Sequence, residues 1–507
     1  MGRTRNTLRN GIWGIGQKVL MLLAPFVIRT LIIKNLGADY LGLNGLFVSL
    51  LQVLNLVELG FSSAITFSLY KPIAEDNKII ICGLLNVYKK IYKCVGIGIL
   101  TIGLILSPFL RFIIKGDIPS DINLHLLYFL YLFNTVISYL LFAYKAVLLE
   151  ASQRNDIIYR TQISTQLAQY IVQIAMLIIF HDYYAYYIFT PIFTCLYNIW
   201  LSNIVDKKFP LYKASGSISN ALKNDLKIRI KGVIIGKICA VSRNAIFGIL
   251  ISASAGLYSV ATYSNYFLIV TSLSSFLTVI TSAMSASVGN SMATESEEKN
   301  HNDFKKFTFI YAWISGVCLC CLTTTLQTFM QLWLGEKMLL PFYMVIGFGA
   351  YFYILTTGDI RSTYMNSKGL WWENRYRTIL EATSNIIFSI IFMKIFGLVG
   401  AILGPLLSMC IFNFGMSSTI LYKYCFPSYR CLNYWTDYIF YMIVTFAACL
   451  SSEVITSKLM KPIDNLYIYL ILCIVISIII SNLLFIIFFH KLSYYKESKI
   501  FLLKMIK

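Results

Sequence analysis

Apolar residues along this chain gather in runs of about 20, separated by shorter polar stretches. An α-helix of that length spans the roughly 30 Å hydrocarbon core of a bilayer. The runs fall near 11–33, 42–68, 91–114, 124–148, 157–180, 183–204, 232–252, 258–290, 307–333, 341–360, 378–396, 398–421, 434–452 and 466–489. The pattern predicts an all-α integral membrane protein with about fourteen transmembrane helices.

Composition supports a polytopic membrane protein. The chain is 58% hydrophobic and 13% charged, whereas a soluble protein carries about 25% charged residues. Its net charge of +20 would suggest nucleic acid in a soluble protein, but here basic loops facing an anionic leaflet explain it, and no nucleic-acid partner is expected. The first run is too long for a signal-peptide core and lacks a cleavage pattern, so we expect it to be retained.

The distribution of lysine and arginine predicts the orientation. With a cytoplasmic N-terminus, most loop cations fall on the cytoplasmic side, and the densest basic loop is 205–231. The outer side then collects only Lys34, Arg111, Lys115, Lys337, Lys394, Lys458 and Lys461. By the positive-inside rule, both termini are predicted to be cytoplasmic.

When the cations of loops and run ends are assigned to one side of the membrane or the other, four of the 43 lysines and arginines remain inside apolar runs, in the first and seventh only. They are Lys18, Arg29, Lys237 and Arg243. A charge in hydrocarbon costs at least about 2.5 kcal/mol, so such residues usually face a wet or protein-lined interior. Arg29 lies within about 20° of Lys18 on a helix, about 16 Å further along its axis. The alternative is that these long side chains reach the headgroups.

The same four residues suggest two lobes. An offset of 214 residues places Arg29 onto Arg243 and Gly42-Leu43 onto Gly256-Leu257, which is a weak internal match. Faint symmetry between halves is common in transporters. The predicted domains are an N-lobe at 1–206, a basic cytoplasmic linker at 207–231, a C-lobe at 232–424, and two more helices with a basic tail at 425–507.

Other polar residues in the runs are candidates for lining a lumen. Four glutamines in the fifth run recur at spacings of 4, 3 and 4 and share one helix face. They are Gln162, Gln166, Gln169 and Gln173, and the second run adds Gln52, Asn55 and Glu58. For the glutamines, the alternative is hydrogen bonding between helices.

No catalytic constellation is apparent in the sequence. There is no phosphate-binding loop motif, and the four histidines are not clustered. The twelve cysteines lack metal-ligand spacing and are interpreted as small packing residues. No predicted outer loop is long enough to hold an enzyme's catalytic groups. We therefore expect a protein that is not an enzyme and has no metal or cofactor.

The region from Tyr40 to Lys71 resembles polysaccharide flippases of the Wzx type. These belong to the multidrug/oligosaccharidyl-lipid/polysaccharide (MOP) exporter superfamily. The resemblance rests on Gly42-Leu43-x-Gly45-Leu46-Phe47 and on Glu58-Leu59-Gly60-Phe61-Ser62-Ser63-Ala64-Ile65, followed by Tyr70-Lys71-Pro72.

The resemblance implies a V-shaped bundle of two six-helix lobes around a cationic cavity, with two C-terminal helices that accommodate a lipid tail. It implies a bacterial inner-membrane flippase that moves undecaprenyl-diphosphate-linked oligosaccharides outward by alternating access. Polysaccharide polymerase machinery is then an expected partner. Lys18, Arg29, Lys237 and Arg243 would be its lumen cations, and the glutamines would contact sugar.

The energy source of such a flippase is left open between membrane potential, protons and sodium. A cargo with about two negative charges gains on the order of 4–5 kcal/mol per 100 mV when it moves outward. Glu58 is therefore a candidate for three roles: an ion-coupling site, a counter-ion for an empty cationic lumen, or a packing residue. We favour the counter-ion role.

Four other classes compete with the flippase. An ion-coupled multidrug exporter of the multidrug and toxin extrusion (MATE) type is the nearest alternative, but its cationic cargo favours an acidic lumen. A major-facilitator transporter is disfavoured because its signature is missing from 71–90. Short outer loops argue against a polysaccharide-assembly enzyme, and buried charges argue against a passive scaffold.

Overall fold

The computed structural model describes residues 2–55, 61–459 and 465–506, and side chains at 227–245 and 501–506 are among those it does not describe. No strand occurs in these ranges. The chain divides into two compact units, unit 1 (Met1–Ala261) and unit 2 (Thr262–Lys507).

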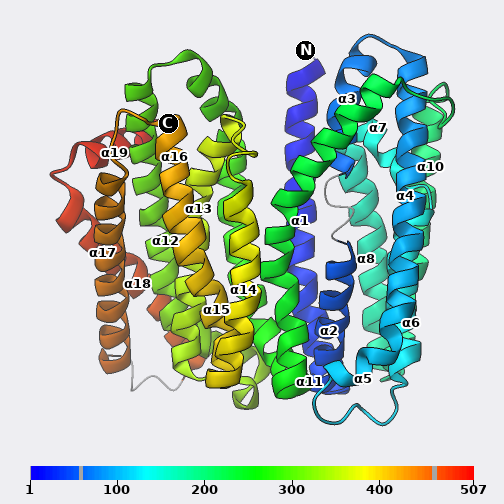
Figure 1. Ribbon diagram of the computed structural model, residues 1–507. Helices are drawn as coiled ribbons and strands as arrows, with labels where there is room; N and C mark the ends of the chain where they lie inside the picture. The colour runs from blue at the N-terminus through cyan, green and yellow to red at the C-terminus, as the bar shows by residue number, and fades with distance from the viewer. Residues whose placement is uncertain (1, 56–60, 460–464, 507) are drawn as a thin grey trace. The chain divides into compact units, whose positions relative to one another are not determined.

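Unit 1 is built of helices of very different lengths (Figure 1). They are α1 (Gly2–Asn35), α2 (Ala38–Leu54), α3 (Phe61–Ala74), α4 (Lys78–Leu106), η2 (Ser107–Phe109), α5 (Leu110–Ile113), α6 (Leu124–Leu140), η3 (Ala143–Lys145), α7 (Ala146–Ala151), α8 (Asn155–Ile179), α9 (Tyr183–Tyr187), α10 (Phe189–Lys208) and the first part of α11 (Asn220–Thr294).

Unit 2 contains the rest of α11 and the C-terminal helices. They are α12 (Glu297–Leu334), η4 (Glu336–Met338), α13 (Phe342–Ser367), α14 (Arg375–Phe396), η5 (Gly397–Val399), α15 (Gly400–Ser408), η6 (Met409–Met416), α16 (Ser417–Cys425), α17 (Cys431–Leu459), α18 (Leu466–Phe489) and α19 (Ser493–Ile506). The segment η6 is a π-helix.

Apolar helices in the described ranges confirm a multi-pass membrane protein. Nine are long and apolar enough to cross a bilayer, and the bent pair α6–α7 makes a tenth candidate. One of the nine covers 375–425, which includes two of the predicted runs. The count of fourteen helices therefore stays a prediction.

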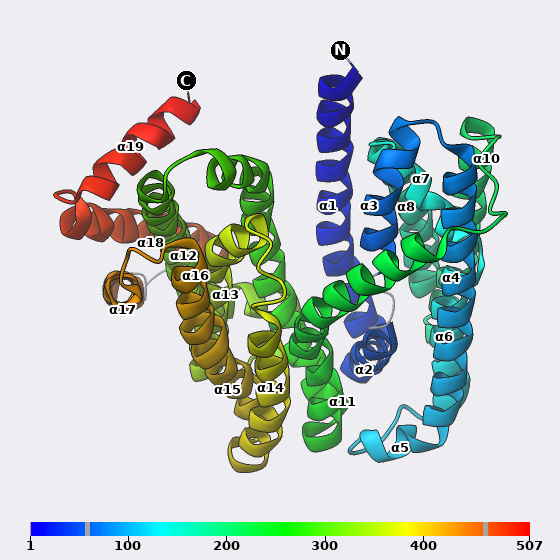
Figure 2. The same cartoon turned by 45° about the horizontal axis from the view of Figure 1, so that its top comes forward.

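Unit 1 is held by α8, which packs against α1 and α10, while α4 packs against α6 and α3, as Figure 2 also displays. Glycines let α2 approach α11. A Cβ at Gly42 would lie 2.2 Å from the carbonyl oxygen of Leu257, so only glycine fits there. The two dipeptides that match at an offset of 214 thus touch each other. Gly256, with φ +80°, forms the bend in α11 that brings Leu257 there.

Unit 2 is organised around α12, which packs against α13, α17, α18 and α19. A separate hairpin of α14 and α15 turns at Gly397, whose φ is +60°. A Cβ at Gly404 would lie 2.4 Å from the hydroxyl oxygen of Ser389. This close approach lets the two helices of the hairpin share polar contacts across their seam.

The predicted linker at 207–231 is an ordered part of unit 1. Its loop crosses the start of α4, where Asn86 Nδ2 donates to the Gly216 carbonyl at 2.7 Å. The Tyr212 hydroxyl donates to Asp76 Oδ1 at 2.6 Å. Helix α11 begins at Asn220, inside the predicted linker.

Candidate functional site

A polar seam runs between α1 and α8 in unit 1. Asn10 Nδ2 donates to the Gln153 carbonyl at 3.0 Å, and Asn35 Nδ2 donates to the Leu177 carbonyl at 3.0 Å. Because residue numbers rise together along both helices, α1 and α8 run in the same direction. We call the facing residues of these two helices the α1–α8 seam.

The two predicted cations of α1 differ in exposure. Lys18 is exposed, and Arg29 is partly buried within electrostatic range of Tyr186 on α9. Lys237 and Arg243 lie in α11, but their side chains are outside the described ones, and Glu58 lies outside the described residues altogether. The proposed grouping of four cations therefore stays a prediction.

The structure separates the four glutamines of α8. Gln17 Nε2 donates to Gln162 Oε1 at 2.7 Å, and Gln173 Nε2 donates to Thr190 Oγ1 at 2.9 Å. Both are hydrogen bonds between elements, which was the alternative interpretation. Gln169 bonds to Gln173 at 3.3 Å along the same helix.

Gln166 is the exception among these glutamines. Its Oε1 is buried and accepts no hydrogen bond from any described residue. A buried amide oxygen without a partner costs about 1–3 kcal/mol, so such groups often mark a ligand or water position. On α2, Asn55 Oδ1 is likewise buried without a described partner, and Gln52 is partly buried.

Tyrosines of α6 and α9 cluster next to Tyr186, which is the residue within electrostatic range of Arg29. Tyr131 and Tyr183 join their hydroxyls at 2.7 Å, and Tyr131 also donates to Asn44 Oδ1 at 3.0 Å. The rings of Tyr131 and Tyr187 stack with centroids 3.7 Å apart. These three tyrosines are buried. The cluster therefore holds α6 against α9 and is part of the core.

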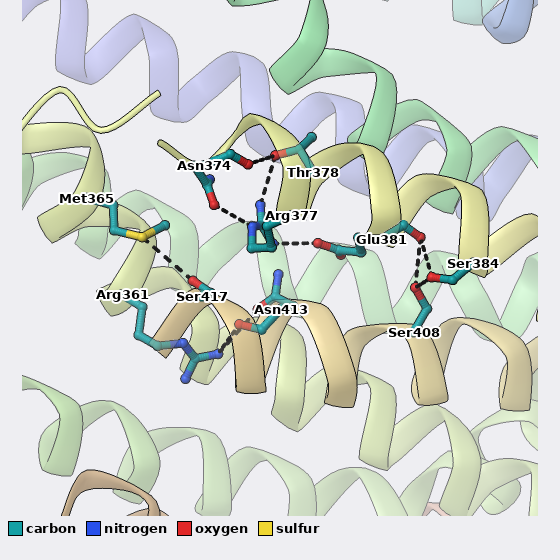
Figure 3. A network of polar contacts seen from close by, with 10 residues as sticks. All are labelled: Arg361, Met365, Asn374, Arg377, Thr378, Glu381, Ser384, Ser408, Asn413 and Ser417. Atoms are coloured by element: carbon teal, nitrogen blue, oxygen red, sulfur yellow. Dashed lines mark hydrogen bonds and ion pairs between the residues drawn. The ribbon is translucent and has the colours of Figure 1, made fainter. Parts of the chain in front are cut away.

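Unit 2 contains a buried cation that lies one residue beyond the predicted apolar run 341–360. Arg361 on α13 is 0% exposed. Its Nη1 donates to the Tyr434 hydroxyl at 2.6 Å. Its Nη2 donates at 3.2 Å to Asn413 Oδ1 in the π-helix η6, as Figure 3 shows. The rings of Phe414 and Tyr438 lie 5.3 and 5.9 Å from the guanidinium carbon.

No sequence signal identifies this arrangement, because its partners are 52 to 77 positions away along the chain. Glycine at 358 helps it form, since a Cβ there would lie 2.8 Å from Asn413 Oδ1. We call Arg361 and its enclosing residues Asn413, Phe414, Tyr434 and Tyr438 the Arg361 cage. It joins α13, η6 and α17.

Glu381 forms an i,i+4 pair with Arg377 at the start of α14. Arg377 Nη1 lies 2.5 Å from Glu381 Oε2, and the Glu381 side chain is fully buried (Figure 3). The Arg377 Nε also donates to Asn374 Oδ1 at 2.6 Å. This network stabilises the start of α14.

An apolar groove of about 200 Å³ lies between α12, α13 and α17 of unit 2. Leu319, Ile346, Phe446 and Leu450 line it. Glu453 is the one acidic residue among its lining residues. A groove of this composition suits a hydrocarbon chain better than a polar solute.

Comparison with solved structures gives the fold. The sequence itself matches no protein-family model and no curated protein. The lipid II flippase MurJ, in an inward closed conformation, aligns over 95% of this chain and 99% of its own, with a TM-score of 0.65 and 15% identity. The chain therefore shares the fold of this flippase.

Two MATE transporters, one of them a member of the MOP superfamily, align less completely. An inward-facing MATE family transporter aligns over 82% of this chain and 99% of its own, with a TM-score of 0.58 and 14% identity. The Vibrio cholerae MATE transporter VcmN aligns over 85% and 99%, with a TM-score of 0.53 and 13% identity. At these identities the likeness concerns the fold alone.

Proposed function

We propose that this chain is a flippase that moves undecaprenyl-diphosphate-linked oligosaccharides from the cytoplasmic to the outer leaflet. The extent of the MOP-fold match carries the proposal. Residues 431–507 are about 15% of the chain, so the 95% match to MurJ includes most of them. The MATE transporters leave 18% and 15% of this chain unmatched. A lipid-flippase architecture therefore accounts for more of the molecule.

The cargo of such a flippase has three chemical parts, and the chain offers a counterpart for each. The diphosphate needs cations, for which we propose Lys18, Arg29, Lys237 and Arg243. The sugars need amides, of which Gln166 has an unused acceptor. The polyprenyl tail needs an apolar surface, for which we propose the groove between α12, α13 and α17.

The proposed setting is the bacterial inner membrane with both termini in the cytoplasm and with polymerase machinery as a partner. The chain acts as a transporter and not as an enzyme. Membrane potential supplies energy for outward movement of the anionic cargo. Glu58 is proposed as a counter-ion for the unloaded cations. In Glu58→Gln, membrane potential should then still drive flipping, and the dependence of the rate on proton and sodium gradients should be the same as in the parent chain.

The test uses purified protein in liposomes that hold a fluorescent lipid-linked oligosaccharide in one leaflet. The parent chain should transfer the lipid, and Arg29→Ala should slow transfer at least about tenfold, because a charge-assisted contact is lost. Arg29→Lys should recover part of the rate. No transfer by the folded parent chain, or full activity of Arg29→Ala, would contradict the proposal.

A MATE-type multidrug exporter is the second candidate, because the MATE structures share the fold. Its cargo would be an organic cation driven by a proton or sodium gradient. The same liposomes, loaded with a cationic dye, distinguish the two functions. Gradient-driven dye transport without lipid transfer would favour the exporter.

A further inference from the structure

Three cations surround one buried carboxylate where α1, α8 and α10 meet. Arg9 Nε lies 2.8 Å from Asp156 Oδ2, and Arg154 Nε lies 2.9 Å from Asp156 Oδ1. The Asp156 side chain is 1% exposed, whereas those of Arg9 and Arg154 are 32% and 26% exposed. The carboxylate is therefore sealed in the protein, and the cations reach water.

Lys208, the last residue of α10, completes this cluster. Its charge interacts with Arg9, Arg154 and Asp156 together. We call these four residues the Asp156 cluster. Its described members carry three positive charges and one negative charge, which leaves an excess of two positive charges at one end of the seam.

This excess is more than the local structure requires. One arginine is enough to neutralise a buried carboxylate, and like charges held close together repel each other. Asn10 already supports the same end, because its Oδ1 accepts from the Asp156 backbone N–H at 2.8 Å. A second arginine and a lysine therefore add cost unless an anion approaches them.

We propose that the Asp156 cluster is a loading site for the diphosphate group of the lipid-linked substrate before it enters the membrane interior. Two excess positive charges match the two negative charges of a diphosphate diester, and guanidinium groups recognise phosphate oxygens well. The inference rests on the proposed flippase function and on the predicted cytoplasmic N-terminus.

The position of the cluster on the seam supports this role. Arg9 precedes Lys18 by about 14 Å and Arg29 by about 30 Å along the axis of α1. A headgroup bound at the Asp156 cluster thus lies at the start of the helix that carries both predicted lumen cations. Loading and translocation would use successive cations of one helix.

The test compares neighbouring lysines on α10, Lys208→Gln and Lys207→Gln. Lys207 is exposed and carries the same charge, but it is not part of the cluster. Farnesyl diphosphate binding to the full chain in uncharged nanodiscs should weaken about fivefold in Lys208→Gln and stay within about twofold in Lys207→Gln. The salt bridges to Asp156 come from Arg9 and Arg154, so substitution of Lys208 spares both arginine contacts. Arg154→Gln should weaken binding further, with folding checked by gel filtration.

Further arms of the experiment identify the source of the phosphate. Inorganic pyrophosphate should compete with farnesyl diphosphate, whereas phosphatidylglycerol in the nanodisc should compete only weakly. Equal affinities in the two lysine variants, or competition by phosphatidylglycerol alone, would overturn the loading site. Lipid transfer by the parent chain is measured in the same preparations. If transfer occurs while the two lysine variants bind equally well, the flippase function is supported and the loading site is contradicted.

Discussion

Arg29 and Arg361 are both arginines of long helices, yet their surroundings differ sharply. Arg29 in unit 1 is partly buried and lies within electrostatic range of Tyr186. Arg361 in unit 2 is wholly buried, hydrogen-bonded to Tyr434 and Asn413, and enclosed by aromatic rings. Arg361 is thus enclosed by protein groups and stabilises unit 2, whereas the ligand role of Arg29 stays a proposal.

The physical reason lies in desolvation. A fully enclosed guanidinium has exchanged its water for hydroxyl, carbonyl and ring partners, and a ligand would have to displace these. Charge inside a helix therefore does not indicate ligand binding by itself, since an enclosed cation such as Arg361 can serve the structure alone.

The largest predicted effect is on unit 2. Arg361→Ala should lower stability by about 3 kcal/mol, because it leaves a cavity and removes the donors for Tyr434 and Asn413. Arg361→Met, which keeps most of the volume and removes the charge, should cost less. The measurement is the midpoint of thermal unfolding in detergent.

The exposed Arg160 of α8, which lies over the Trp13 ring, supplies the matched control. Arg160→Ala should shift the midpoint little. Equal midpoints for Arg361→Ala and Arg160→Ala would break the distinction between enclosed and open cations.

A smaller effect should separate two glutamines of the seam. Gln162→Leu should cost about 1 kcal/mol, because Gln17 loses its partner at 2.7 Å. Gln166→Leu should leave stability unchanged or raise it, because its Oε1 accepts no bond from the described residues. If Gln166 contacts the sugar, Gln166→Leu should slow lipid transfer more than Gln162→Leu does. Normal lipid transfer by Gln166→Leu would remove Gln166 from the site.

The sequence predicted the apolar cores of helices well. The run at 466–489 coincides with α18, and 157–180 lies within two residues of α8. Hydrophobicity, however, marks only the part of a helix that lies within the membrane. Helices α1 and α11 extend beyond that part and begin at Gly2 and Asn220, well before their predicted starts. The π-helix η6 inside 398–421 leaves no trace in an apolar pattern.

The candidate site was predictable only in part. Helical periodicity identified the glutamine face of α8, but it did not indicate which glutamine pairs with α1. The Arg361 cage and the Asp156 cluster depend on contacts between residues far apart in the chain, such as Arg9 and Asp156. Patterns within one helix contain no information about such partners.

The smallest predicted effect concerns a polar contact at the water-exposed surface, where enclosure is least. The Asp76 carboxylate, which accepts the Tyr212 hydrogen bond, raises the pKa of Tyr212 from 10.0 to about 12. A raised pKa stabilises the protonated hydroxyl, so the bond contributes fully below about pH 10 and is lost as the pH rises towards 12.

Tyr212→Phe should therefore speed trypsin cleavage of the 209–219 loop at Lys213 only a few-fold at pH 8, since an exposed hydrogen bond contributes about 1 kcal/mol or less. The ratio of variant to parent cleavage rates should be constant from pH 7 to 9. A Tyr212→Phe chain cleaved no faster than the parent would mean that the remaining contacts, led by Asn86 and Gly216, hold the loop alone.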